Sequence, residues 1–182
     1  MPLRLGNLKD WGKDWNSPAE IPISKESVDI FDPIHGYIRL EKQEAFILDL
    51  PPMQRLRHIS QLGLANLVYP GANHTRFEHS IGVCHLVKNV LKAFKQRKIE
   101  GLKLDETTCH TAILAALLHD IGHFPFSHVT ESLVRYNFKN RDHEIFSSEI
   151  INTPYMKSAF DVMHACFRQK VEALNGFCYF VD

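Results

Sequence analysis

The sequence predicts a nearly all-α fold in one domain, with a short β-hairpin near the N-terminus. Three observations lead to this prediction. Apolar residues recur with helical spacing over most of the chain after residue 41, helix-capping residues precede several of these stretches, and strand-like alternation is confined to residues 30–40. A length of 182 residues suits a single domain with its own core.

The composition is that of a soluble globular protein. The 21 Lys and Arg residues balance the 21 Asp and Glu residues, and 45% of the chain is hydrophobic. A disordered tail is excluded, and nucleic-acid binding is disfavoured, since no net positive charge would attract phosphates. No signal peptide is visible, and the longest apolar run, residues 112–118, is too short to cross a membrane. We therefore expect an intracellular protein, cytoplasmic or nuclear, with reduced cysteines.

The N-terminal half contains the only predicted strands. Residues 1–29 show no period and are interpreted as an irregular arm. Residues 30–40 alternate around an Asp-Pro pair and a glycine, which predicts a short hairpin. Helical composition starts at residue 41 and is interrupted by two prolines. Because proline is favoured in a first helical turn, a new helix is predicted over residues 53–62, with Gly63 as its C-terminal stop.

A long central helix is predicted over residues 76–95. Thr75 and Glu78 have the spacing of a capping box, with Thr75 at the N-cap. One stripe of this helix carries His79 followed by Val83, Leu86 and Val90, so His79 is predicted to face the interior. The basic end of the helix suits the negative end of its dipole and is interpreted as a solvated helix end, with nucleic-acid binding as the weaker alternative.

Further helices complete the predicted fold. Asp105 is placed to cap a helix that continues to His119 and is ended by Gly122 and Pro125. Three more helices are predicted over residues 127–138, 143–151 and 155–174.

The most informative chemical feature is the pair His119-Asp120 at the end of an apolar helix. Together with His79, these side chains make a mixed nitrogen and oxygen site for a divalent cation plausible. Such a site could also admit water and phosphate oxygens. The alternative is structural, because a single histidine on an apolar face is more often a core residue. The ligand types do not distinguish Fe, Mn, Zn, Ni or Mg.

Five blocks of sequence carry a family resemblance. In this order, they resemble the HD-domain phosphohydrolases, and in particular the deoxynucleoside triphosphate (dNTP) triphosphohydrolase branch, whose members include enzymes with an added SAM domain. The blocks are residues 31–36, 54–63, 69–72, 74–83 and 117–128. The match runs from about residue 30 to 151 and implies a mainly helical HD domain over residues 30–182, after an arm of residues 1–29.

The resemblance also implies roles for individual residues. It implies the metal ligands His79, His119 and Asp120, the catalytic residues His123, His143 and Glu131, and the substrate-binding residues Arg76, Gln61, Leu62 and His128. Gln61 and Leu62 would pack on the deoxyribose, and Glu131 stands where the family usually has aspartate. Structural alternatives remain for some of them. Arg76 could pair with a surface acid, Gln61 could be a polar helix end, and His128 could cap a helix.

The implied reaction is the conversion of a dNTP and water to a deoxynucleoside and triphosphate, with metal-dependent attack of water on the α-phosphate. The implied partners are this nucleotide, further copies of the chain and a guanine-nucleotide effector. The effector would bind at Asp49, Gln54 and Arg57. Asp49 could instead be a helix-boundary residue.

The sequence departs from the family in its C-terminal part. The family has a fourth metal ligand, an aspartate on a later helix, and it is not identifiable here. Asp142, Asp161 and Asp182 do not stand in its context. The resemblance therefore implies an incomplete HD core. Three interpretations stay open: a fragment of a longer enzyme, a short member completed by a partner chain, and an impaired HD domain that binds nucleotide or oligomerises.

Overall fold

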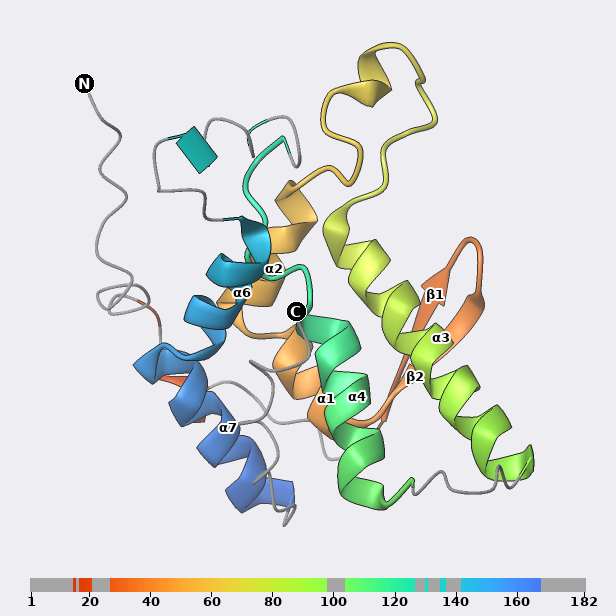
Figure 1. Ribbon diagram of the computed structural model, residues 1–182, viewed down its shortest axis with the longest axis vertical. Helices are drawn as coiled ribbons and strands as arrows, with labels where there is room; N and C mark the ends of the chain where they lie inside the picture. Colours follow the sequence, from red (N-terminus) through yellow and green to blue (C-terminus); the bar gives the residue numbers. More distant parts are fainter. Residues whose placement is uncertain are drawn as a thin grey trace.

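The computed structural model describes residues 15, 17–20, 27–97, 104–126, 130, 135–136 and 142–167. This part of the chain is mainly helical with one two-stranded sheet, which confirms the predicted fold class (Figure 1). The strands are β1 (Val28–Asp32) and β2 (Gly36–Leu40). The α-helices are α1 (Lys42–Leu48), α2 (Pro51–Gln54), α3 (Arg76–Arg97), α4 (Glu106–Leu118), α6 (His143–Ile151) and α7 (Pro154–Phe167).

The hairpin forms where the alternation predicted it. β1 and β2 are antiparallel, with Val28 opposite Leu40 and Asp32 opposite Gly36. In the turn, the Asp32 carboxylate accepts hydrogen bonds from the backbone amides of Ile34 and His35, both at 2.8 Å. Gly36 has a φ of 71°, a conformation that favours glycine. Alternation along β2 buries Ile38 and Leu40, so the hairpin contributes one face to the core.

The core lies among the helices. α3 packs along α4, while α1 contacts both α4 and α7 (Figure 1). The fully buried residues include Phe46, Met53, Leu117, Ile121 and Met156, which come from α1, α2, α4, the turn after α4 and α7. None of the described helices has both the length and the hydropathy that a membrane crossing requires.

The orientation of α3 differs from the prediction. Its buried apolar side chains include Phe77, Ile81 and Leu91, whereas Leu86 and Val90 are about half exposed, at 50% and 49%. The helix carries apolar residues on two stripes, and the structure buries the other one. His79 therefore lies at the edge of the buried face, where its side chain is 35% exposed. The prediction that the His79 stripe faces the interior was wrong, although His79 still reaches the site described below.

The helix predicted over residues 53–62 is also different. α2 ends at Gln54, a 3-10 helix follows over Arg55–His58, and Ile59 is extended. Tertiary pairing explains the early end. The Ile59 carbonyl accepts a hydrogen bond from the Arg76 amide (2.8 Å), and the Gln61 amide donates to the His74 carbonyl (3.1 Å). This pairing with the start of α3 overrides the helical composition of the segment.

The later helices agree with the prediction where they are described. Asp105 caps α4, since its carboxylate accepts a hydrogen bond from the Thr108 amide at 2.6 Å. α6 has the predicted bounds, and α7 starts one residue before the predicted helix. The prediction for residues 127–138 falls mostly outside the described residues, as does the end of the helix predicted to reach residue 174.

Candidate metal centre

Two local structures bring the candidate residues together. At the start of α3, the Thr75 amide donates to the Glu78 carboxylate (2.6 Å) and the Glu78 amide to the Thr75 hydroxyl (3.4 Å). This is the predicted capping box, and it places Arg76 and His79 in the first turns of α3. α4 ends at Leu118, and the chain then forms the turn of residues 119–123. We call this segment the His-Asp turn.

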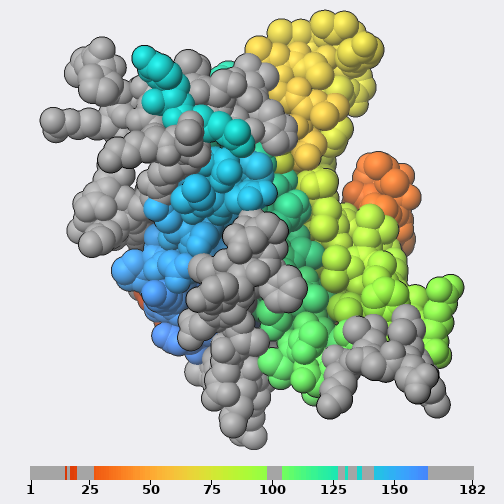
Figure 2. Space-filling view, in the orientation of Figure 1, coloured from red at the N-terminus to blue at the C-terminus, as the bar shows by residue number. Residues whose placement is uncertain are grey.

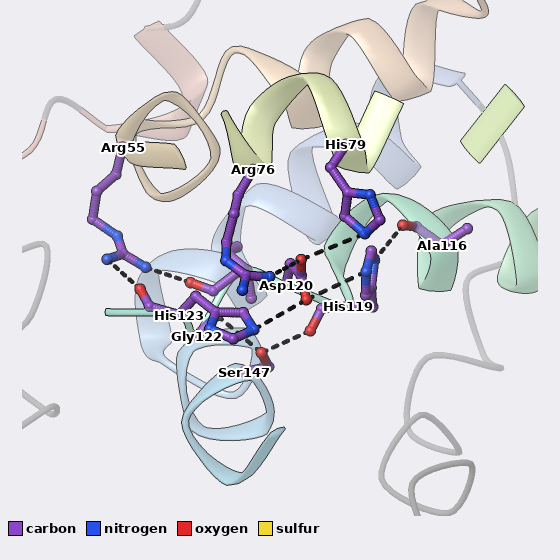
Figure 3. Close-up of polar contacts among 10 residues, drawn as sticks. Arg55, Arg76, His79, Ala116, His119, Asp120, Gly122, His123 and Ser147 are labelled. Carbon is purple, nitrogen blue, oxygen red and sulfur yellow. Dashed lines mark hydrogen bonds and ion pairs between the residues drawn. The ribbon is translucent and has the colours of Figure 1, made fainter. Parts of the chain in front are cut away.

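Asp120 is the centre of the group (Figure 3). Its carboxylate is 6% exposed and faces side chains from α3 and from its own turn. The Oδ2 atom lies 2.5 Å from Nη1 of Arg76 and 3.7 Å from Nε2 of His79. The Oδ1 atom lies 3.3 Å from Nε2 of His119 and 3.4 Å from Nε2 of His123. One buried carboxylate therefore faces three imidazoles and one guanidinium.

His119 is held in the tautomer that a metal ligand needs. Its Nδ1 atom lies 2.8 Å from the carbonyl oxygen of Ala116. A carbonyl can only accept, so Nδ1 carries the proton and donates it. In the neutral ring, Nε2 then keeps its lone pair, and Nε2 is the atom that faces Asp120. A backbone carbonyl thus fixes both the orientation of the ring and the atom available for coordination.

The described residues contain two overlapping groups whose ligand atoms lie within 4.8 Å of one another. The first is His79, His119 and Asp120, and the second is Asp120, His123 and His143. The first group is the set of metal ligands that the resemblance implied. In the second group, the rings of His123 and His143 are stacked, with centroids 3.9 Å apart and planes 17° apart. His143 stands in the first turn of α6, which is capped by the Asp142 carboxylate.

The electrostatics favour the protonation states that metal ligands need. Burial alone would raise the pKa of Asp120, but the hydrogen bond from His123 and the charges of His119 and Arg76 hold it well below its usual range. Burial lowers the pKa of His79, which Asp120 only partly offsets. At neutral pH the lowered pKa values favour an ionised Asp120 carboxylate and a neutral His79 imidazole, the forms that bind divalent cations.

The metal-free chain should lose stability as the pH falls from about 6.5 to about 4. Burial lowers the pKa of His123 to about 4, although its hydrogen bond to Asp120 opposes this shift. The unfolded chain, where histidine has its ordinary pKa of about 6.5, then binds more protons over this window, so the free energy of unfolding decreases with falling pH. Urea unfolding across the window, with a chelator present, measures the slope. His123→Gln should flatten the slope, and a variant slope equal to that of the wild-type chain would contradict this account.

The predicted substrate-binding residues have different surroundings. Arg76 is 2% exposed and paired with Asp120, so it lies in the buried group around this carboxylate and does not form a surface ion pair. Gln61 lies in the segment paired with the start of α3. Leu62, 52% exposed, begins the loop that projects from the molecule, shown in yellow in Figure 2. The predicted residues His128 and Glu131 lie outside the described residues.

The residues proposed for an effector are neighbours. The Nε atom of Arg57 donates to the side-chain oxygen of Gln54 (2.8 Å), and the Gln54 amide nitrogen donates to the Leu48 carbonyl (2.8 Å). The Arg57 guanidinium also lies 3.6 Å from the centre of the Phe77 ring. Burial raises the pKa of Asp49, and the charge of Arg57 opposes this. The three side chains thus form one surface group at the α1–α2 connection.

Two residues with structural roles in the site were not predicted. Arg55 donates to the carbonyl oxygens of Ile121 (2.6 Å) and His123 (2.8 Å), which holds the His-Asp turn from the side of α2. Ser147 holds the turn from the side of α6. For Ser147 the signal was present, because it follows His143 by four residues and so shares its helix face. For Arg55 no spacing indicated a partner in the turn.

Lys88, a basic residue in the middle of α3, forms an ion pair with a buried acid. Its ammonium group donates to the buried carboxylate of Glu44 (2.6 Å) and to the Arg39 carbonyl (2.8 Å). Lys88 therefore contributes to the packing of α3 against α1 and the hairpin, which leaves a smaller basic surface for nucleic acid.

Comparison with known sequences defines the class of protein. The sequence model of the HD domain matches residues 76–158, which contain the His-Asp turn and all residues of the two candidate metal groups. Residues 76–158 therefore belong to the HD-domain family. The assignment of residues 30–75 to the same domain stays a prediction.

Within this class, the chain is related to the deoxynucleoside triphosphate triphosphohydrolases. It is 42% identical over 134 residues to the SAMHD1 enzyme of that name from Danio rerio, 71% of this chain and 21% of the relative. It is 46% identical over 100 residues to that of Homo sapiens, 55% of this chain and 16% of the relative. The SAMHD1 homolog of Dictyostelium discoideum is 34% identical over 157 residues, 81% of this chain and 30% of the relative. The chain thus spans less than a third of the length of these relatives.

Proposed function

We propose that the chain is a metal-dependent phosphohydrolase of the HD class that hydrolyses dNTPs to deoxynucleosides and triphosphate. The observation that carries this proposal is the surroundings of Asp120, where one buried carboxylate meets three imidazoles and a guanidinium. The relatives that share this sequence are named for hydrolysis of the same substrate class.

The donor set fits a divalent cation. His79, His119 and Asp120 would hold it, because their ligand atoms lie close together and the Ala116 carbonyl leaves Nε2 of His119 available. When bound, the cation would polarise a phosphate oxygen and lower the pKa of a coordinated water. Arg76 is permanently charged and lies at the same carboxylate, so it can move from Asp120 toward the negative phosphate and offset the charge that develops there.

Proton transfer is assigned to the second group. Water attacks the α-phosphorus, the bond to the 5′ oxygen of the deoxynucleoside breaks, and this oxygen must receive a proton. The stacked His123 and His143 lie beside Asp120 and are not among the three proposed ligands, so we assign them the uptake and delivery of this proton. We extend the site to Gln61 and Leu62 for the deoxyribose, and to His128 and Glu131, on the family resemblance alone.

The fourth ligand defines the main alternative. In the described part of the chain, each candidate group contains three ligands. The Asp142 carboxylate caps α6, and Asp161 is exposed on α7. Three protein ligands are sufficient for a catalytic metal site. An impaired domain that binds nucleotide or self-associates is the second candidate, and the grouping of Asp49, Gln54 and Arg57 favours it.

One experiment separates these functions. The 182-residue chain is loaded with Mn²⁺, Mg²⁺ or Fe²⁺ and incubated with each dNTP, with and without a guanine nucleotide. Chromatography resolves the products, and light scattering measures the mass of the protein in solution. We expect a deoxynucleoside and triphosphate. Release of a deoxynucleoside monophosphate and inorganic pyrophosphate would show that a different bond breaks. A nucleotide-dependent change in mass without turnover would favour the binding module, and absence of both would contradict the proposed activity.

A further inference from the structure

The His-Asp turn and α6 are in direct backbone contact. A Cβ atom built on Gly122 would lie 2.3 Å from the His143 carbonyl oxygen and 2.3 Å from the Ser147 amide nitrogen. Such distances show that no side chain fits between the two segments. The turn carries His119, Asp120 and His123, while α6 carries His143. The two segments that carry these four residues therefore meet at Gly122.

One hydroxyl joins the two segments. Ser147 is 6% exposed, and its Oγ donates a hydrogen bond to the His119 carbonyl oxygen at 2.9 Å. The same Oγ accepts a hydrogen bond from the Gly122 amide, also at 2.9 Å. A serine hydroxyl has one proton and two lone pairs, so both bonds can exist together. The two backbone groups that it binds lie on either side of Asp120 (Figure 3).

We propose that Ser147 is a positioning residue of the metal centre: its hydroxyl fixes the His-Asp turn against α6 and thereby sets the positions of the ligands His119 and Asp120. The inference rests on the proposed function for its link to metal, but the positioning itself concerns the metal-free chain. Both of these hydrogen bonds of the Ser147 hydroxyl go to backbone groups and not to the side chain of a candidate ligand. It acts on the backbone of residues 119 and 122 and, through α6, on the stacking of His143 against His123.

The physical reason is that backbone position decides where the ligand atoms lie. The turn is held on its other side by Arg55, which binds the carbonyls of Ile121 and His123. From the side of α6, Ser147 supplies side-chain hydrogen bonds to the backbone of the turn. Loss of a group that orients metal ligands commonly costs about 10- to 100-fold in metal affinity.

Ser147→Ala tests the proposal, with Thr153→Ala as its matched control. Thr153 is also buried, and its hydroxyl likewise donates to a carbonyl (Ile150, 2.7 Å) and accepts from an amide (Met156, 3.3 Å), but it lies between the end of α6 and the start of α7. Mn²⁺ affinity is measured by competition with a chelator. In the metal-free chains, NMR follows exchange of the Gly122 amide and the ring resonances of His119 and His123.

We expect Ser147→Ala to weaken Mn²⁺ binding about 10- to 100-fold, accelerate exchange at Gly122 and shift both ring resonances, while Thr153→Ala leaves all three at wild-type values. Ser147→Cys keeps a weak donor and should fall between, and it replaces Ser147→Ala if that variant does not fold. Wild-type values in the Ser147 variants would overturn the proposal. If the wild-type chain binds no Mn²⁺, the proposed function fails, and the Gly122 exchange and ring shifts still decide whether Ser147 positions the turn.

Discussion

Asp120→Asn is expected to abolish metal binding and any phosphohydrolase activity and to destabilise the chain strongly. The substitution keeps the size of the side chain but removes the charge that faces Arg76 and the three histidines. Loss of a side chain that coordinates the metal directly should lower Mn²⁺ affinity by more than about 100-fold. This is a larger effect than the loss of a group that only orients a ligand. The Arg76 guanidinium would also stay buried opposite a neutral amide. Breaking a buried ion pair in this way typically costs about 3–5 kcal/mol.

Asp161→Asn is the matched control, since it makes the same chemical change at an exposed position of α7. Elemental analysis of the purified proteins measures bound metal, and urea unfolding measures stability. The control should match the wild-type chain in both. An Asp120→Asn protein that retains its metal would contradict the assignment of Asp120 as a ligand, whatever its stability.

Gly122→Ala is expected to separate α6 from the His-Asp turn. The added methyl group would lie 2.3 Å from two backbone atoms of α6, far inside van der Waals contact, and backbone cannot move aside as a flexible side chain can. Overpacking in a core typically costs about 1–3 kcal/mol, and we expect a value at the upper end because no rotamer change relieves the clash. The stacking of His123 on His143 should be lost with the contact.

Gly71→Ala provides the comparison, because a Cβ at Gly71 meets nothing within 4 Å. Both substitutions reduce the flexibility of the unfolded chain similarly, so the difference between them isolates the steric effect. The free energy of unfolding and the histidine ring resonances are measured for both. Equal stabilities would show that the turn and α6 are less closely packed than the structure indicates.

Local signals in the sequence predicted most of the fold. The caps at Thr75 and Asp105 and the alternation along β2 depend on neighbours within a few residues, and the structure confirms them. The failures have a long-range cause. The 3-10 helix and extended segment after Gln54 exist because α3 pairs with Ile59, and the buried stripe of α3 was ambiguous because the helix is apolar on two sides.

The candidate site was predicted in a similar way. The pair His119-Asp120 and the position of His79 indicated a metal group, and the family resemblance extended it to Arg76, His123 and His143. In the structure, Arg76 and three of the histidines face the Asp120 carboxylate, and His143 stacks on His123 beside it. Arg55 could not be found from sequence, because its partners are backbone carbonyls 66 and 68 residues away, and a carbonyl carries no residue-specific signal.

The wide sequence separation of these contacts has a consequence for folding. Arg76 meets Asp120 across 44 residues, and Ser147 meets the His119 carbonyl across 28. The entropy of closing such loops must be offset by the core before any ligand set exists, so partly folded chains hold no preformed site. A cation would then select the fully closed chain and raise its melting temperature by mass action. Metal capture by this chain would then indicate that folding is complete.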